Sequence, residues 1–400
     1  MSDFHQHGTI ATLHRLGNPD YSRLGRELDA LADTSPVALV LPCHARDLES
    51  PALKEILAEL AGVKFVRFVV AGLDGADEAA WQKARRLFNN LPQESAVLWN
   101  DGPRIQTLIQ QLESAGLEPG PMGKGRNMRL CFGYVLAASK VPIMAVHDCD
   151  VVNYRREMLV RLCYPVAHPE MGFEVSKGFS ARFSDRLNGR VMRLLITPLL
   201  RALEECGSFP HALSSLQCFR YPISGEVCLH RRVAEALRYP SDWGVETGMM
   251  ADIFRVCDPQ RVCQVDIAEA YDHKHQALSE QDPRGGLNKM ACDVALCLLR
   301  SIPTESPDVM GHLVPRYSRL AIEMLKFYEA DARINLLHYD RDLEQRTVHL
   351  FAESIERAIE VHLENPKQAP GAPSWNEIHE RLPDFGVELA QAVHADNHSL

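Results

Sequence analysis

Short apolar runs alternate with amphipathic stretches over the first hundred residues. Residues 36–42, 63–73 and 95–100 are rich in Val, Leu, Ala and Phe, which is typical of buried strands. The stretches between these runs, ALKEILAEL and EAAWQKARRLFNNL, repeat apolar residues at helical spacing. Strands that alternate with such helices predict a doubly wound, mostly parallel sheet, whose ligands bind beyond the carboxyl ends of the strands. We therefore expect the reactive loops to follow Pro42, Val70, Asn100 and Val146.

The pattern changes twice further along the chain. A further apolar strand is predicted within residues 141–154, after a glycine-punctuated loop that opens into a helix. Residues 165–270 mix short strands, a helix and turns, and beyond about residue 285 long amphipathic helical patterns begin. The sequence thus predicts an α/β domain followed by a helical C-terminal region.

Composition narrows the class of protein. The chain has 400 residues, of which 46% are hydrophobic and 24% charged, and this excludes an intrinsically disordered chain. The formal net charge of −10 argues against nucleic acid or an anionic membrane as a partner, so an anionic small molecule needs a local basic pocket. The eleven cysteines form no C-x-x-C pair, which favours reduced, mostly buried thiols. No run of about 18 apolar residues and no signal-like start is present, and we expect a cytoplasmic protein.

Two aspartates one residue apart, Asp148 and Asp150, end the apolar strand before residue 151. Both carboxylates cannot point into the core, and together they can bind a hard divalent ion that bridges to a diphosphate. The alternative is that one aspartate caps a helix and the other is solvated, because the D-x-D tripeptide is common.

A glycine-lysine loop, Gly123–Met128, precedes a predicted helix. The free N–H groups and dipole of a helix N-terminus attract anions, and Lys124 adds a full charge. A glycine turn with a solvated lysine is the alternative. The loop does not match the P-loop pattern, and no G-x-G-x-x-G follows the first strand, so a nicotinamide-binding site is disfavoured.

Three later segments combine glycine, acids and histidine: residues 221–226 (YPISGE), 241–248 (SDWGVETG) and 271–276 (YDHKHQ). Glycine lets the backbone approach a ligand closely, and a neighbouring carboxylate accepts hydrogen bonds from hydroxyl groups such as those of a sugar. His273 is a candidate to complete a metal site begun by the aspartates, although a lone histidine is more often structural or exposed.

Taken in order, these motifs resemble the glucosyl-3-phosphoglycerate synthases and, more distantly, the mannosylglycerate synthases. The ordered set is P-C-H-A, G-K-G-x-x-M, D-x-D, N-G-R-V with T-P-L-L, P-x-S-G-E, S-D-W-G-V-E-T-G and D-H-K-H, between about residues 37 and 280. Both families are retaining glycosyltransferases of the GT-A fold that use sugar nucleotides. Together with the patterns above, the resemblance predicts three parts: an N-terminal extension (1–35), a Rossmann-like α/β GT-A domain (36–285) with nucleotide-binding (about 36–150) and acceptor-binding (about 151–285) halves, and a C-terminal helical extension (286–400).

The resemblance also implies roles for individual residues on the donor side. Pro42 and His44 would lie at the base and ribose, and Lys124 at the nucleotide or its phosphates. The two aspartates of the D-C-D motif and His273 would hold a divalent ion, Mg²⁺ or Mn²⁺.

On the side of the reacting sugar, Glu246 would hold the hydroxyls of the donor hexose. Ser224 and Gly225 would line the reacting centre through backbone atoms. The residues expected to contact the sugar or the acceptor, including the G-R pair that receives an acceptor phosphate, are Gly189, Arg190, Ile223, Trp243, Glu246, Tyr271 and His275.

Departures from the family pattern leave the substrates open. The first loop, residues 44–47, reads H-A-R-D where the family has an acid. This leaves the base of the donor open, and the candidates are UDP-, GDP- and ADP-glucose. Met192 stands where the family has a hydroxyl-bearing residue, and residues 271–275 read Y-D-H-K-H where the family has R-x-H-R-N. These departures leave unphosphorylated D-glycerate as an alternative acceptor. The cations that remain to neutralise a phosphate are Lys177, Arg186, Arg190 and Lys274.

The expected function is transfer of a hexose, glucose, from a nucleoside-diphosphate sugar to 3-phospho-D-glycerate in compatible-solute synthesis. The resemblance implies a homodimer that acts on small-molecule substrates. Alternatives are a glucosyl- or mannosylglycerate synthase acting on D-glycerate and a non-catalytic sugar-nucleotide-binding protein. A nucleotidyltransferase is disfavoured, because its glycine loop usually follows the first strand.

Overall fold

A computed structural model of the chain describes most of its residues. The described residues are 6, 8–17, 20–207, 211–272, 278, 282, 285–302, 307–366, 368–369 and 371–398. His273, His275 and Lys274, which the sequence singles out, lie outside them.

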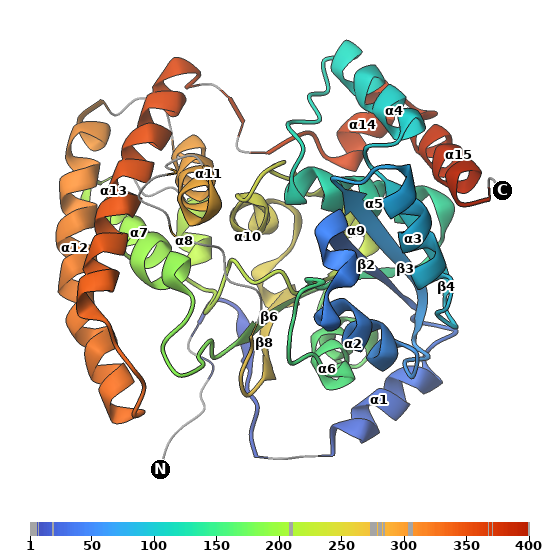
Figure 1. Cartoon of the computed structure of the whole chain (residues 1–400), viewed down its shortest axis with the longest axis horizontal. Helices are drawn as coiled ribbons and strands as arrows, with labels where there is room; N and C mark the ends of the chain where they lie inside the picture. The colour runs from blue at the N-terminus through green and yellow to red at the C-terminus, as the bar shows by residue number, and fades with distance from the viewer. Residues whose placement is uncertain are drawn as a thin grey trace.

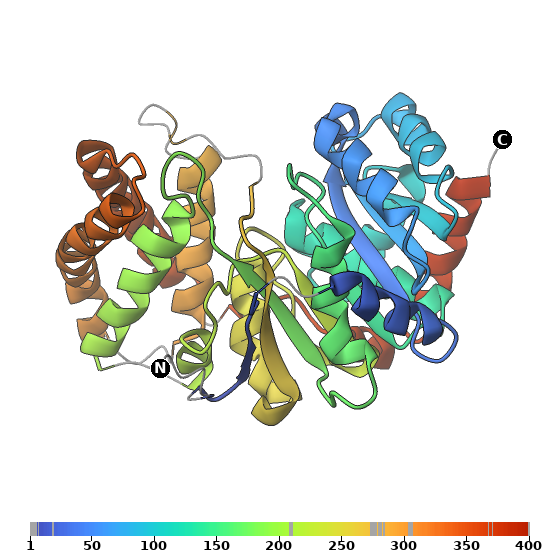
Figure 2. The same ribbon diagram turned by 90° about the horizontal axis from the view of Figure 1, so that it is seen from below.

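Within the described residues, eight strands form one mixed sheet that runs through the molecule (Figures 1 and 2). Across the sheet they are β1 (Ala11–Leu13), β8 (Val262–Ala268), β6 (Val175–Ser180), β7 (Val227–His230), β5 (Ile143–Val146), β2 (Val37–His44), β3 (Val66–Asp74) and β4 (Glu94–Trp99). Neighbouring strands are parallel except for β7, which runs antiparallel to β5 and β6. The predicted α/β fold with a mostly parallel sheet is confirmed.

Helices cover both faces of the sheet around β2. Alternate side chains of β2 enter two separate apolar layers, Ala38 and Val40 on one face and Val37 and Leu39 on the other, as the period of two in a strand requires. One layer contains α1 (Tyr21–Ala30), α2 (Pro51–Leu60), α3 (Glu78–Phe88) and α6 (Arg156–Ala167). The other contains α4 (Pro103–Ser114), α5 (Lys124–Ala138) and α9 (Arg231–Ala236). Because helices bury both faces of β2, its sequence is a continuous apolar run.

The second half of the molecule is mainly helical. Its elements are the π-helical turn η2 (Val191–Ile196), α7 (Thr197–Glu205), α8 (His211–Leu216), α10 (Val245–Val256), α11 (Gly286–Arg300), α12 (Pro307–Ile334) and α13 (Arg341–Glu364). In Figures 1 and 2, α12 and α13 lie at the end of the molecule opposite α3 and β4. None of the helices in the described ranges is both long and apolar enough to cross a membrane. The eleven cysteines all lie in the described residues, none of them forms a disulfide, and eight are buried.

The C-terminal region divides between the two ends of the molecule. Whereas α11, α12 and α13 pack beside α7 and η2, the chain then crosses to the other end of the molecule (Figure 1). There α15 (Phe385–His398) covers α4, α5 and β4, and α14 (Trp375–Arg381) packs against α9. Asn397 in α15 accepts from the N–H of Val97 at 3.0 Å and donates to its C=O at 2.9 Å. The helix therefore satisfies backbone groups of β4, the last strand of the sheet, which would otherwise be exposed at an edge.

Two elements of the predicted N-terminal extension (1–35) are joined to the sheet domain. β1 pairs in parallel with β8 at the other edge of the sheet, and α1 packs against α6.

We predict that Asn397→Ala lowers the free energy of unfolding by about 1–3 kcal/mol, because the amide and carbonyl of Val97 lose their partner. Gln391→Ala, at an exposed position of the same helix, is the control and should change stability by less than about 0.5 kcal/mol. Urea denaturation of the two variants measures both values. Equal stabilities would contradict the role given to Asn397.

Candidate active site

A cavity of about 760 Å³ opens at the carboxyl ends of β2, β3 and β5. Its walls come from the loops after these strands, the start of α5, residues 182–191, the start of α10 and one side of α11. The sequence-predicted residues that line it are Pro42, His44, Lys124, Asp148, Asp150, Gly189, Arg190, Ile223, Trp243 and Glu246. Segments far apart in the chain thus converge at the place expected for a ligand of an open α/β sheet.

Three other predicted residues do not line the cavity. Ser224 and Tyr271 are buried behind its wall, each 1% exposed, and Gly225 lies against the carboxylate of Asp148. His273 and His275 lie outside the described residues.

Lys124 occupies the centre of the site. Its Nζ lies 2.5 Å from Oδ1 of Asp148 and 2.6 Å from Oε1 of Glu246, and 17% of its side chain is exposed. Burial disfavours the ammonium ion, but the two carboxylates outweigh this effect and raise the pKa of Lys124 well above its usual value. The lysine therefore stays charged and joins an acid that follows β5 to an acid in α10.

A close approach between α5 and residues 240–242 brings Lys124 to Glu246. The N–H of Arg126 donates to the C=O of Ser241 at 3.0 Å. A Cβ at Gly125 would lie 1.9 Å from the carbonyl oxygen of Pro240, so any larger residue would push the helix away. The glycines of the G-K-G motif therefore serve packing as well as access to the cavity.

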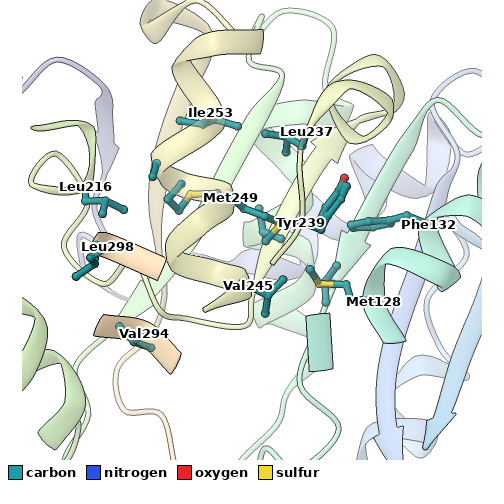
Figure 3. Packing of buried hydrophobic residues seen from close by; sticks show 14 of the residues in the cluster. Met128, Phe132, Leu216, Leu237, Tyr239, Val245, Met249, Ile253, Val294 and Leu298 are labelled. Carbon is teal, nitrogen blue, oxygen red and sulfur yellow. The ribbon is translucent and has the colours of Figure 1, made fainter. Parts of the chain in front are cut away.

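Glu246 is fixed by the packing of the helix that carries it. It lies in the first turn of α10, where a negative charge is favoured by the helix dipole. Val245, Met249 and Ile253 of the same helix are completely buried. Figure 3 shows α10 packed between side chains of α5 and α11. This apolar contact leaves the carboxylate of Glu246 at the cavity wall.

The D-C-D motif follows β5, and both of its aspartates line the cavity. Asp150 makes no hydrogen bond with any described residue. Burial, and then repulsion from Asp148, raises the pKa of Asp150 to about 7. Just beyond the motif, the N–H of Val152 donates to the C=O of Asp272 at 2.9 Å. The chain immediately before residue 273 thus lies beside the D-C-D motif.

The P-I-S-G-E segment lies directly under Asp148. A Cβ at Gly225 would be 2.3 Å from Oδ1 of Asp148, which only glycine avoids. The buried ammonium of Lys177 donates to the C=O of Ser224, and the hydroxyl of Ser224 donates to Glu226 at 2.6 Å. Lys177 therefore supports the segment from behind and, contrary to the possibility raised by the sequence, does not line the cavity.

Arg182 is a cavity residue that the sequence did not indicate. Its guanidinium carbon lies 4.0 Å from the ring centre of Tyr271 and 4.4 Å from that of Tyr221, and Nη2 is 3.7 Å from Oε2 of Glu226. Burial opposes its charge, but the tyrosines and then Glu226 outweigh burial and raise the pKa of Arg182. Tyr271, predicted to contact substrate, thus lies behind an arginine that lines the cavity.

Arg182 begins a hairpin, and two further arginines of the cavity wall lie in or just after it. The N–H of Asn188 donates to the C=O of Arg182 at 2.9 Å, which closes the hairpin. Arg186 lines the cavity and pairs with Asp185 at 2.7 Å. Arg190 follows and is bound through Nε to Glu344 at 2.9 Å. Met192 is partly buried against the core, so a side chain that packs replaces the family's hydroxyl-bearing one.

Two cavity residues, Asp74 and Arg182, were not predicted, because their sequence signals are weak or absent. Asp74 lines the cavity at the end of β3 and accepts a hydrogen bond from Asn100 at 2.8 Å. An acid at the carboxyl end of a strand was a usable signal for it, as it was for Asp148. Arg182 had none, because its site depends on aromatic rings forty and ninety residues away.

Comparisons with known proteins agree with the motif pattern. The chain is 35% identical to a glucosyl-3-phosphoglycerate synthase of Persephonella marina over 401 residues, covering 99% of each chain. It is 31% identical to one of Methanococcoides burtonii over 404 residues, covering 98% of each. No profile of a protein family matches the chain.

Among solved structures, the chain resembles glucosyl-3-phosphoglycerate synthase of Mycobacterium tuberculosis in complex with Mn²⁺, UDP-glucose and phosphoglyceric acid. The TM-score is 0.53 at 22% identity, covering 73% of this chain and 87% of that one. The complex of the same enzyme with Mg²⁺ and UDP gives a TM-score of 0.51 at 22% identity, with coverage of 73% and 86%. This likeness confirms the expected GT-A fold, and the near full-length relatives show that the chain belongs to the glucosyl-3-phosphoglycerate synthase family.

Proposed function

We propose that this chain transfers glucose from UDP-glucose to 3-phosphoglycerate, giving glucosyl-3-phosphoglycerate and UDP, in the cavity between its two halves. The observation that carries the proposal is the ion-pair cluster of Lys124, Asp148 and Glu246 in the wall of that cavity. It sets a cation for phosphates beside a carboxylate for sugar hydroxyls.

The loops of the nucleotide-binding half form the donor side. Pro42, His44 and Asp74 line the cavity at the ends of β2 and β3, where a base and ribose would bind in a sheet of this kind. Gly123 and Lys124 line it at the start of α5, whose dipole and lysine favour the diphosphate. The bound nucleotides of the solved relatives are UDP or UDP-glucose, which supports uridine over guanosine or adenosine.

The residues present fit a divalent cation. Asp148 and Asp150 supply hard carboxylate oxygens to one cavity, and Asp150 has no hydrogen bond to satisfy it within the described residues. No set of three His, Cys, Asp or Glu side chains suited to a metal is found in the described part of the chain, and His273, the third ligand we propose, lies outside it. A bound Mg²⁺ or Mn²⁺ would stabilise negative charge on the departing diphosphate.

The transfer breaks the bond between the anomeric carbon and the phosphate oxygen and forms a bond from that carbon to the hydroxyl oxygen of the acceptor. The proton of the hydroxyl passes to the departing phosphate, so no enzyme base is required. Attack from the side of the leaving group retains the anomeric configuration. In this reaction Lys124 stabilises the charge that develops on the phosphate, and Glu246 accepts hydrogen bonds from the glucose hydroxyls.

The acceptor side carries three guanidinium groups. Arg182, Arg186 and Arg190 line the cavity opposite the nucleotide loops, and guanidinium forks bind carboxylates and phosphates in two-point contacts. Several guanidinium groups in one wall suit 3-phosphoglycerate, which carries both groups, better than D-glycerate.

The proposal is tested by incubating the protein with UDP-, GDP- or ADP-glucose, an acceptor and Mg²⁺ or Mn²⁺, and identifying the product by mass. Glucosyl-3-phosphoglycerate should form fastest from UDP-glucose and 3-phosphoglycerate. Faster reaction with D-glycerate would instead favour a glucosylglycerate synthase, and nucleotide binding without any glycoside would indicate a non-catalytic binding protein.

Lys124→Met should lower kcat/KM by about 100-fold or more, because the departing phosphate loses a placed cation and two carboxylates lose their shared partner. Lys140→Met, at an exposed lysine just after α5, is the matched control and should retain wild-type kinetics. Steady-state rates of UDP release measure both. Wild-type turnover by Lys124→Met would refute the role of the ion-pair cluster.

Chelation of divalent ions should abolish activity, and added Mg²⁺ or Mn²⁺ should restore it. Asp150→Asn should reduce kcat/KM by roughly 100-fold or more and weaken Mn²⁺ binding, followed by the paramagnetic resonance of the free ion. Asp33→Asn, at an exposed aspartate outside the cavity, should change neither. Wild-type activity and wild-type Mn²⁺ binding in Asp150→Asn would remove Asp150 from the metal site.

A further inference from the structure

The first turn of α13 contributes a buried carboxylate to the acceptor wall of the cavity. Glu344, whose side chain is 5% exposed, accepts from Nε of Arg190 at 2.9 Å on Oε1. It also accepts from Nη1 of Arg193 at 2.6 Å on Oε2 and from Nη2 of Arg193 at 3.3 Å on Oε1. One acid from the C-terminal region therefore joins two arginines more than 150 residues away in the chain.

Arg193 extends this cluster into the cavity hairpin. Its Nε donates to the C=O of Asn188 at 2.9 Å, and Nη2 donates to the C=O of Leu187 at 3.2 Å. The guanidinium carbon also lies 4.9 Å from the ring centre of Tyr328 in α12. Glu344 thus holds the guanidinium of Arg193, which in turn binds the backbone of residues 187–188.

A second contact from the same region supports the hairpin. The N–H of His338, in the connection between α12 and α13, donates to the C=O of Asp185 at 2.8 Å. The cavity wall and the C-terminal helices are therefore linked through both the backbone and Glu344.

The orientation of Arg190 follows from these contacts. Glu344 takes its Nε, whereas Nη1 and Nη2 make no hydrogen bond with the described residues. Arg190 also lines the cavity. An arginine held through Nε has lost most of its rotamer freedom, and its two terminal nitrogens keep their donors for a ligand with oxygen acceptors.

We propose that Glu344 is a positioning residue for the acceptor: it holds Arg190 so that the terminal nitrogens meet the phosphate of 3-phosphoglycerate. This inference rests on the proposed function. It gives the C-terminal helices a direct part in acceptor recognition. A carboxylate that served only to neutralise the arginines would, on removal, leave acceptor binding unchanged or tighter.

The test uses the full-length enzyme and the variant Glu344→Gln, which keeps the shape of the side chain and removes its charge. The KM for 3-phosphoglycerate should rise about tenfold or more, as expected when a charge-assisted hydrogen bond that orients a binding group is lost. The KM for UDP-glucose should stay within about twofold. Glu353→Gln, at an exposed position of the same helix, is the control and should match the wild type.

A double-mutant cycle separates positioning from general stabilisation. If Glu344 acts through Arg190, then Glu344→Gln should add little to the effect of Arg190→Gln on the KM for 3-phosphoglycerate. Additive effects, an unchanged KM for 3-phosphoglycerate, or equal increases in both KM values would overturn the proposal. If Glu344→Gln does not fold, as judged by circular dichroism, then Glu344→Asp applies the same criteria with a smaller expected increase.

Failure of the proposed function gives a different result. In that case the wild-type enzyme forms no glucosyl-3-phosphoglycerate, whatever residue 344 is. Calorimetric titration of wild type and Glu344→Gln with 3-phosphoglycerate then still measures whether Glu344 affects acceptor binding, and equal affinities would overturn the positioning role independently of turnover.

Discussion

The ammonium group of Lys124 holds the site together, because it lies within hydrogen-bond distance of acids from both halves of the molecule. Asp148 follows β5, and Glu246 lies in the first turn of α10. Bringing a mostly buried lysine between two carboxylates is favourable only when all three are in place, since removing one charge leaves the others poorly compensated. The packing of Gly125 against Pro240 and of α10 against α5 therefore holds these three charged groups together.

Three arginines lie in one part of the cavity wall although the chain as a whole is acidic. The chain as a whole carries a formal charge of −10, yet Arg182, Arg186 and Arg190 line one wall of the cavity. Each is held by different means. Arg182 lies against two aromatic rings, Arg186 pairs with a neighbouring aspartate, and Arg190 pairs with an acid from α13. Fixing a long side chain in advance reduces the entropy lost when a ligand binds. A chain of net negative charge can therefore still present guanidinium groups to an anionic ligand.

The sequence predicted what depends on short segments. Apolar runs located strands β2, β3 and β4, and the D-C-D and G-K-G motifs located Asp148, Asp150 and Lys124, because a strand end and a helix start are local features. Contacts between distant segments were not predictable in this way. Neither the stacking of Arg182 on Tyr271 nor the pairing of Arg190 with Glu344 leaves a pattern in either segment alone. The same holds for β1, which is only three residues long and joins the sheet through β8, and for the passage of α14 and α15 to the far side of the molecule.

A crystal structure of this protein with UDP-glucose bound tests the central role of Lys124 most directly. The account predicts that the nucleotide occupies the cavity at the ends of β2, β3 and β5, with its diphosphate beside the ammonium of Lys124 and its glucose hydroxyls on Glu246. A nucleotide bound elsewhere, or one in this cavity with Lys124 turned away and Asp148 and Glu246 separated, would contradict it.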